Sequence, residues 1–400
     1  MSLLPIGFIA PRRLAVLPPL ALYIHIPWCV RKCPYCDFNS HEARGTTPED
    51  RYVDALIADL ESALPSVWGR RTVTVFFGGG TPSLFAPRSI ETVLDAVRAR
   101  LSLDADVEIT LEANPGTFEV EKFRAFRDAG VNRLSIGVQS FQPDSLRALG
   151  RVHDGDEARA AIEGALRWFG RVNVDLMYAL PEQTPEAALA DLETALALGV
   201  RHLSAYQLTV EPNTYFHRYP PKLPDEDASE RIEQVVHDRL AAAGLERYEI
   251  SAFAAPGHRA RHNLNYWTFG DYLGIGAGAH GKLSLPDRIF RQVRHRQPQH
   301  YIDTALAGEA VSEQHDVADD ELAFEFMLNA LRLVDGVAVR SFTERTGLPL
   351  SHIGAKLDAA EARGLLLRDH RWLQPTPLGL RFHNDLVQMF LSDPAAPPGP

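Results

Sequence analysis

The sequence predicts an α/β fold: a partial, open (β/α)6 barrel followed by a small helical, winged-helix-like C-terminal domain. Apolar, β-branched runs alternate with longer helical patterns, and the joints between them are short. This alternation indicates a parallel sheet that is buried on both faces. A complete eight-unit barrel typically needs about 250 residues, whereas residues 21–250 supply six clear units. The partial barrel is therefore favoured, and a doubly wound open sheet is the alternative.

The six expected strands are short apolar runs that are rich in β-branched residues. They are expected at residues 21–26, 72–77, 107–112, 133–139, 172–180 and 202–208. The segments between them show the apolar spacing of amphipathic helices. Three of these helices are followed by a glycine that can take the left-handed cap conformation: Gly130, Gly199 and Gly244.

The whole chain is expected to divide into five segments. These are an N-terminal tail (1–20), the barrel core (21–250), a connecting segment (251–310), the winged-helix-like domain (311–390) and a disordered tail (391–400). Winged helices often bind DNA, but residues 311–390 carry four more acidic than basic residues. Such a surface repels phosphate, so no nucleic-acid partner is expected.

Three features of the sequence indicate a cytoplasmic protein. No apolar run reaches the roughly 18 residues that a membrane helix needs, and residues 1–20 lack the order of a secretion signal. The three cysteines lie in one tight cluster, which is unlike a disulfide framework. A reducing, cytoplasmic setting is therefore expected, with any membrane association transient and made through partner proteins.

The three cysteines, Cys29, Cys33 and Cys36, have the spacing C-x3-C-x2-C directly after the first expected strand. A structural zinc site needs four protein ligands, and His25 or His41 could be the fourth. A four-iron cluster usually takes four cysteines, so three would leave one iron open to a small molecule. The loop is expected at the carboxyl end of a strand, which is the face where barrels place their active sites.

This motif, with the aromatic Tyr35 between the last two cysteines, resembles that of the radical S-adenosylmethionine (SAM) superfamily. The resemblance implies a 4Fe-4S cluster whose open iron is chelated by the amino and carboxylate groups of SAM. Polar residues near the ends of the later strands are consistent with such a ligand, because buried polar groups need partners.

Five further stretches, YIHIPWC, GGGTPS, LEANPG, GVQSF and DLMYALPEQT, resemble those of oxygen-independent coproporphyrinogen III dehydrogenases and their relatives. The resemblance spans about residues 20–385. It implies that Cys29, Cys33 and Cys36 hold the cluster. The SAM contacts that it implies are Tyr23, Tyr35, Gly79, Gly80, Thr81, Glu112, Gln139, Arg151 and Asp175.

Two features separate this chain from the dehydrogenases and favour the haem chaperone branch of the same group. The dehydrogenases carry another cysteine two positions after the third, where this chain has Phe38. Residues 262–267, HNLNYW, resemble the HNxxYW motif of the haem chaperones, which bind haem and pass it to acceptor proteins. The resemblance implies His262 as an axial haem ligand. The structural alternative is a packed corner in which His262 only forms hydrogen bonds.

The expected function is therefore a SAM-binding 4Fe-4S protein that carries haem, or a related tetrapyrrole, to haem-dependent acceptor proteins. The alternatives are oxidation of coproporphyrinogen III, radical methylation or ring opening of haem, and a zinc-stabilised barrel without redox function. Whether the protein is an enzyme stays open, since Phe38 replaces the fourth motif cysteine. A homodimer is a further option.

Two weaker features follow the HNxxYW motif. Residues 274–283 are rich in glycine, and His280 within them is expected to be structural. Four arginines, Arg288, Arg291, Arg294 and Arg296, follow closely. They could match porphyrin propionates, but a solvated face paired with Asp and Glu is the favoured interpretation.

Overall fold

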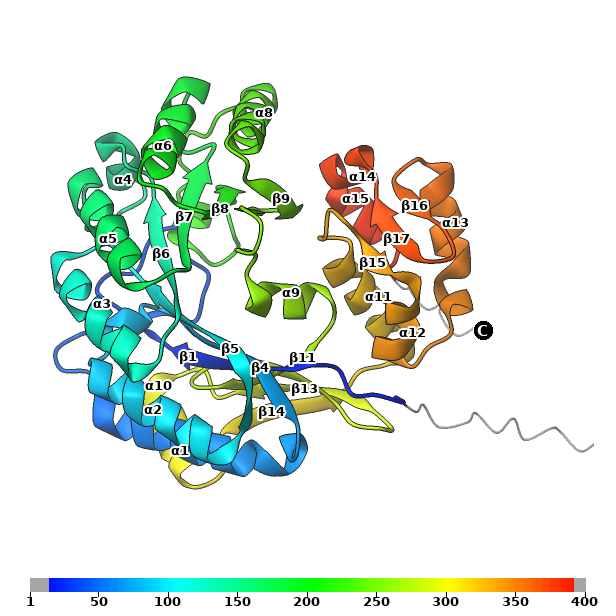
Figure 1. Ribbon diagram of the computed structural model, residues 1–400, viewed down its shortest axis with the longest axis horizontal. Coiled ribbons are helices and arrows are strands. Elements are labelled where there is room, and N and C mark those ends of the chain that lie inside the picture. The colour runs from blue at the N-terminus through cyan, green and yellow to red at the C-terminus, as the bar shows by residue number, and fades with distance from the viewer. Residues whose placement is uncertain (1–13, 392–400) are drawn as a thin grey trace, which may run out of the picture.

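The structure is a computed structural model that describes residues 14–391, apart from the side chains of residues 117–119. Most of the expected N-terminal tail (residues 1–13) and almost all of the expected C-terminal tail (residues 392–400) lie outside the described residues. Figure 1 shows a curved sheet with helices around its outer face and a smaller lobe beside it.

The main sheet has twelve strands in the order β14-β13-β12-β11-β1-β4-β5-β6-β7-β8-β10-β9. Its centre consists of six parallel strands, β1 (Leu20–Ile26), β4 (Arg71–Gly79), β5 (Ser102–Ala113), β6 (Arg133–Gln139), β7 (Val172–Tyr178) and β8 (His202–Gln207). All six expected strands are confirmed. Their order in the sheet follows the chain without a reversal, so the partial barrel is confirmed and the doubly wound sheet is excluded.

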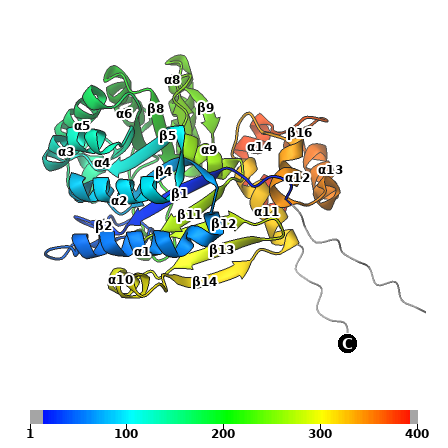
Figure 2. The same cartoon turned by 60° about the horizontal axis from the view of Figure 1, so that its bottom comes forward.

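Amphipathic helices cover the outer face of the curved sheet (Figures 1 and 2). They are α1 (Glu49–Val67), α2 (Pro87–Arg100), α3 (Thr117–Ala129), α5 (Gly155–Trp168), α6 (Pro185–Ala197) and α8 (Glu226–Ala242). Their apolar faces and the outward side chains of the strands form one core. Side chains alternate between the two faces of a strand, so the polar residues of the central strands point into the curve.

The segment expected as a connection (251–310) extends the sheet, together with residues 311–316 from the start of the expected winged-helix-like domain. The strand β11 (Asp271–Ile275) pairs with β1 in parallel, and β12 (His280–Ser284), β13 (Ile289–Arg294) and β14 (Val311–Asp316) follow in antiparallel order. At the opposite end of the sheet, the short strands β10 (Ala252–Ala254) and β9 (Glu246–Glu249) pair in antiparallel order. All of these added strands are short, and β11 and β12 each contain a glycine, so their apolar periodicity is weak in the sequence.

A buried carboxylate fastens this extension to the barrel. Asp59 of α1 forms an ion pair with Arg294 of β13 at 3.2 Å, and both side chains are almost fully buried. Asp59 Oδ2 also accepts hydrogen bonds from the Tyr301 hydroxyl at 2.9 Å and from the Gly276 amide at 3.2 Å. One carboxylate therefore holds together α1, β13, the loop after β11 and the helix α10 (Pro298–Leu306).

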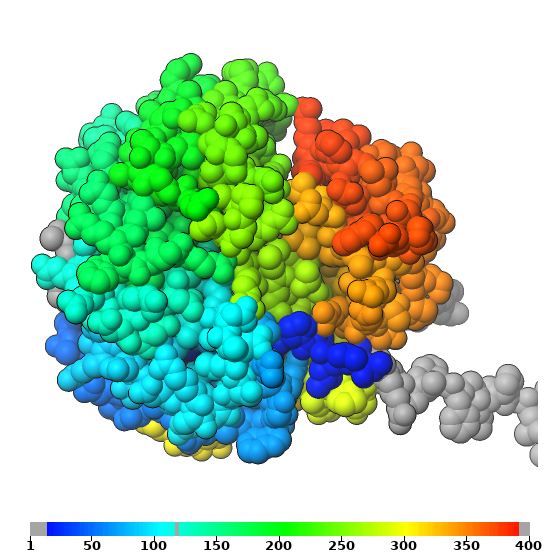
Figure 3. All heavy atoms as spheres, in the orientation of Figure 1, coloured from blue at the N-terminus to red at the C-terminus, as the bar shows by residue number. Residues whose placement is uncertain are grey.

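The C-terminal lobe has its own apolar core. It contains α11 (Asp319–Ala330), β15 (Val337–Ala338), α12 (Val339–Thr346), α13 (Gly354–Ala362), β16 (Leu366–Arg368), β17 (Trp372–Pro375), α14 (Pro377–Arg381) and α15 (His383–Gln388). Its small sheet has the order β15-β17-β16, which together with the helix order is the winged-helix arrangement. Figure 3 shows this lobe packed against one side of the barrel. Among the described residues, no helix combines the length and apolarity needed to cross a bilayer.

Candidate functional site

The loop that carries the three cysteines is anchored at the carboxyl end of β1 by backbone hydrogen bonds. The amides of Gly80 and Thr81 donate to the carbonyls of Ile26 and Trp28, at 2.8 and 2.7 Å. Two short paired strands, β2 (Trp28–Cys29) and β3 (His41–Glu42), close the base of the loop. The loop is thereby held at the edge of the sheet where all central strands end.

The cysteines are free, partly exposed thiols that line one cavity. The ends of β4 to β8 form its other walls. The expected site residues that line this cavity are Cys29, Cys33, Cys36, Tyr35, Gly79, Gly80, Thr81, Glu112, Gln139, Arg151 and Asp175. The structure thus brings together most of the residues that the sequence singled out, from positions spread over about 150 residues.

Gly79 and Gly80 are required by the close approach of β4 to the cysteine loop. A Cβ at Gly80 would lie 2.5 Å from the carbonyl oxygen of Trp28. Gly79 has φ +114°, and a Cβ there would lie 2.5 Å from the His25 ring. Any larger residue would push the loop away from the strand. These two glycines therefore set where the cysteines stand relative to β4.

Arg151 brings a positive charge to the cysteines. One of its terminal nitrogens lies 3.5 Å from Cys33 Sγ, and the other donates to Asn114 Oδ1 at 2.7 Å. Its Nε is buried and has no hydrogen-bond partner among the described residues. A buried donor without a partner is costly, so this nitrogen is available to a ligand.

Two carboxylates, Glu112 and Asp175, face the same cavity, and neither forms an ion pair among the described residues. Burial, and next the negative charge of Asp175, raise the pKa of Glu112 to about 8. Burial also raises the pKa of Asp175, although Asn173 donates a hydrogen bond to it at 2.8 Å. The amide of Gly79 donates to Glu112 at 3.2 Å. A ligand ammonium group in the cavity would stabilise the charged form of both carboxylates and so lower their pKa.

Gln139, at the end of β6, has a left-handed backbone with φ +70°. This conformation is uncommon for a residue other than glycine and often marks a functional site. The Tyr206 hydroxyl of β8 donates to its Oε1 at 2.8 Å. The strained turn and this hydrogen bond hold the Gln139 amide in the cavity.

Tyr23, expected among the SAM contacts, lines a neighbouring cavity instead of the one that contains the cysteines. Its hydroxyl is hydrogen-bonded to His25 Nδ1 at 3.0 Å. Phe38, which stands at the position of the missing fourth cysteine, lines both cavities. The two cavities are therefore adjacent and share one aromatic wall.

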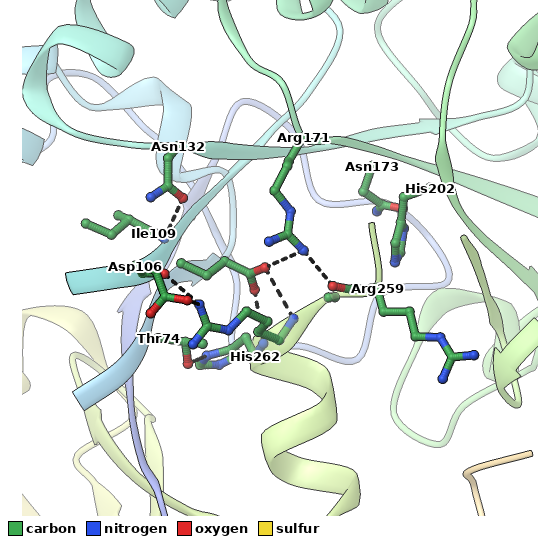
Figure 4. A network of polar contacts seen from close by, with 12 residues as sticks. Thr74, Asp106, Ile109, Asn132, Arg171, Asn173, His202, Arg259 and His262 are labelled. Carbon is green, nitrogen blue, oxygen red and sulfur yellow. Dashed lines mark hydrogen bonds and ion pairs between the residues drawn. The ribbon is translucent and has the colours of Figure 1, made fainter. Parts of the chain in front are cut away.

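The helix that contains the HNxxYW motif, α9 (Arg261–Trp267), lies inside the curve of the sheet. The Glu108 carboxylate of β5 accepts hydrogen bonds from the backbone amides of Arg261 and His262, at 3.2 and 3.0 Å. Arg171 pairs with the same carboxylate at 3.0 Å (Figure 4). A buried anion thus fixes the N-terminus of α9, where the helix dipole favours negative charge.

His262, expected as an axial haem ligand, is not among the residues that line either cavity. Its Nδ1 is 2.8 Å from Thr74 Oγ1, and its Nε2 is 3.2 Å from the Tyr266 hydroxyl. The ring stacks on Phe76, and burial lowers the pKa of His262 to about 3. Iron could reach the ring only by displacing one of these partners. These contacts favour the structural alternative, a packed corner in which His262 forms hydrogen bonds.

The other motif residues point in two directions. Tyr266 lines the second cavity, whereas Trp267 packs towards the C-terminal lobe, with the Arg332 guanidinium 4.2 Å from its ring centroid. One seven-residue helix therefore connects the sheet, the second cavity and the C-terminal lobe.

Sequence reasoning missed several residues of the first cavity, among them Asn114, Ser135, Gly137 and Tyr206. Asn114 lies in the quoted stretch LEANPG, two positions after Glu112, which was chosen from it. Ser135, Gly137 and Tyr206 follow from the two-residue period of their strands once the inward face of one residue is known.

The comparisons with known proteins agree with this architecture. Residues 23–195 match the model of the radical SAM superfamily, and residues 317–382 match that of the HemN C-terminal domain. Among solved structures, coproporphyrinogen III oxidase (HemN) from Escherichia coli, described as a radical SAM enzyme, has a TM-score of 0.79 and 25% identity. That likeness covers 94% of this chain and 90% of the other. The partial barrel and its cysteine loop define a radical SAM protein, which implies a 4Fe-4S cluster and SAM as cofactors.

Curated relatives narrow this class. The chain is 49% identical over 382 residues to the heme chaperone HemW of Escherichia coli strain K12, which covers 94% of this chain and 99% of that protein. It is 34% identical to the protein of the same name from Bacillus subtilis strain 168, over 93% of this chain and 99% of that protein. The mouse mitochondrial radical S-adenosyl methionine domain-containing protein 1 is 37% identical, over 93% and 87% of the two chains. The chain belongs to the HemW family.

Proposed function

We propose that this protein binds haem and delivers it to haem-dependent acceptor proteins, with a 4Fe-4S cluster and SAM as its cofactors. The observation that carries the proposal is the similarity, over nearly the full length of both chains, to proteins named heme chaperone. The replacement of the fourth motif cysteine by Phe38 supports the chaperone over the alternative, a coproporphyrinogen oxidase.

The donor set of the first cavity fits these cofactors. Cys29, Cys33 and Cys36 would hold the cluster, which supplies an iron with an open coordination position for SAM. A structural zinc site needs four protein ligands, whereas a 4Fe-4S cluster that binds SAM at its open iron needs three cysteines. The three free cysteines of this cavity therefore favour a cluster over zinc.

The chain's own residues would bind and orient SAM. Glu112 and Asp175 present carboxylates to its positive charges, and the buried Nε of Arg151 offers a donor. Gly79 and Gly80 keep the strand close to the cysteine loop, which limits water between them. The three free thiols suit a reducing compartment, and we propose the cytoplasm.

The test is an anaerobic haem titration of the full-length reconstituted protein, followed by incubation with coproporphyrinogen III, SAM and a reductant. We expect saturable haem binding, transfer of the haem to an added haem-free acceptor, and no protoporphyrinogen. Turnover of coproporphyrinogen without specific haem binding would overturn the proposal in favour of the biosynthetic enzyme.

Removing the charge of Glu112 should weaken SAM binding. In Glu112→Gln we expect about 10- to 100-fold weaker binding, the scale of one charge-assisted hydrogen bond. Because the folded-state pKa of Glu112 is raised to about 8, the unliganded protein retains this proton at neutral pH. Its stability should fall as pH rises from about 4.5 to 8, while SAM affinity should rise over the same range. Calorimetric titration at several pH values would measure this.

Glu91→Gln, at an exposed position on α2, is the matched control and should leave SAM affinity unchanged. A flat pH profile of SAM affinity in the wild-type protein would mean that Glu112 does not face the ligand.

A further inference from the structure

The second cavity lies next to the cysteine cavity and has no assigned ligand. Its volume is about 430 Å³, within the roughly 300–1,000 Å³ range of small-molecule sites. It opens between the cysteine loop, α9 and the strands β11 and β12. Its walls combine aromatic rings, two histidines, an arginine, an asparagine and an aspartate. Imidazole, guanidinium and aromatic side chains are the groups that an iron porphyrin requires.

Two histidines line this cavity, His25 and His280, and of these His280 is the one whose ring has no hydrogen-bond partner among the described residues. His25 lines the cavity, but its two ring nitrogens are hydrogen-bonded to the Tyr23 hydroxyl and to the Asn39 carbonyl, at 3.0 and 2.9 Å. His262 is occupied by Thr74 and Tyr266, as described above. His280 begins β12 and is exposed at the cavity.

The imidazole of His280 is suited to bind iron. Burial, and next the positive charges of Arg291 and Arg296, lower the pKa of His280. The ring is therefore neutral at physiological pH and keeps the lone pair that a haem iron takes from an axial histidine. No proton has to leave for the coordinate bond to form.

Arg296 is the free cation of the arginine cluster. Arg294 pairs with Asp59, Arg291 with Glu325 at 2.8 Å, and Arg288 with Asp316 at 3.9 Å. Arg296 is exposed, lines the cavity and has no ion pair among the described residues. Its guanidinium could therefore take a carboxylate in a fork-to-fork pair.

The aromatic walls would cover the flat faces of the macrocycle. Phe38 is 64% exposed, an unusual state for a large apolar side chain that borders two cavities. Tyr266 and Tyr272 also line the second cavity, and their rings pack edge to face with centroids 4.6 Å apart. Such rings favour apolar, planar ligands.

We propose that this second cavity is the haem site, with His280 as the axial ligand, Phe38 and Tyr266 against the macrocycle, and Arg296 paired with a propionate. The inference rests on the proposed function and places the cargo beside the cysteine cavity. It also assigns a role to the HNxxYW motif. The hydrogen bonds of His262 to Thr74 and Tyr266 hold α9 in place, so that Tyr266 lines the cavity.

The test is a haem titration of the full-length protein and of His280→Ala, followed by visible absorption and by electron paramagnetic resonance. In the variant we expect loss of the spectrum of histidine-ligated haem and an affinity at least about tenfold lower. Added imidazole should restore the ligated spectrum. Arg296→Gln should weaken haem binding by about tenfold without changing the spectrum of the bound haem.

His315→Ala, an exposed histidine of β14, is the matched control and should bind haem normally. If the wild-type protein does not bind haem, the proposed function itself fails. If wild type and His280→Ala bind haem with the same affinity and spectrum, the function stands and the placement of the site is wrong.

Discussion

Replacing Cys33 by alanine is expected to abolish the 4Fe-4S cluster while leaving haem binding intact. The cavity offers three thiolates, so the variant would retain two, which cannot hold the cluster at three of its irons. The anaerobically reconstituted protein should lose its brown colour, and its iron content should fall to background. SAM binding should be lost with the cluster, since the open iron is one of its anchors. The measurement is iron and sulfide content together with the visible spectrum.

Haem affinity should be unchanged in Cys33→Ala, because the cavity that contains the cysteines and the cavity that contains His280 are adjacent but distinct. Cys33 lines the first cavity, and His280 lines the second. Ser40→Ala is a suitable control, because Ser40 lies 3.5 Å from Cys36 Sγ and is not a thiol ligand. It should keep both the cluster and haem binding. A simultaneous loss of cluster and haem in Cys33→Ala would contradict two separate sites.

The second large effect is expected on stability, from Asp59→Ala. The substitution leaves Arg294, whose side chain is 1% exposed, as a buried cation without its partner. It also removes the acceptor of the Tyr301 hydroxyl and of the Gly276 amide. Breaking a buried ion pair from one side typically costs about 3–5 kcal/mol. Chemical denaturation should show a loss of this size in the free energy of unfolding.

Asp303→Ala tests whether burial is the cause. Asp303 of α10 pairs with Arg51 of α1, so it joins two of the same elements, but the two side chains are 56% and 58% exposed. Exposed pairs contribute little, so this variant should unfold at nearly the wild-type denaturant concentration. Equal losses in the two variants would show that the contact between helices, and not the buried charge, carries the stability.

The central strands were predictable because each contains a short run that is rich in apolar and β-branched residues. The extension of the sheet was not, since β11 pairs with β1 across most of the chain. Its residues DYLGI are too few to show a period, and the glycine-rich loop that follows obscures the next strand. Long-range pairing of this kind leaves no local trace in a sequence.

The candidate site, like the fold, could be predicted only in part from the sequence. Cys29, Glu112 and Asp175 could be placed in one cavity because the carboxyl ends of parallel strands meet at one edge. The surroundings of the two histidines could not be predicted: the sequence favoured His262 as a haem ligand and His280 as a structural residue. His262 belongs to a motif yet is enclosed by Thr74 and Tyr266, whereas His280 lies in a glycine-rich stretch and has a free ring. Which ring nitrogens are already bonded depends on neighbours that only the folded chain supplies.

The pairing of β11 with β1 also matters while the protein is being made. Leu20 and Asp271 are partners in the sheet although they are roughly 250 positions apart along the chain. At about 5–20 residues per second, one edge of β1 would stay uncovered for roughly ten to fifty seconds of synthesis. That edge belongs to a strand whose Leu22 and Ile24 are fully buried in the finished fold. An open apolar edge is a template for intermolecular pairing, so the nascent chain passes through an aggregation-prone interval that ends only when β11 leaves the ribosome.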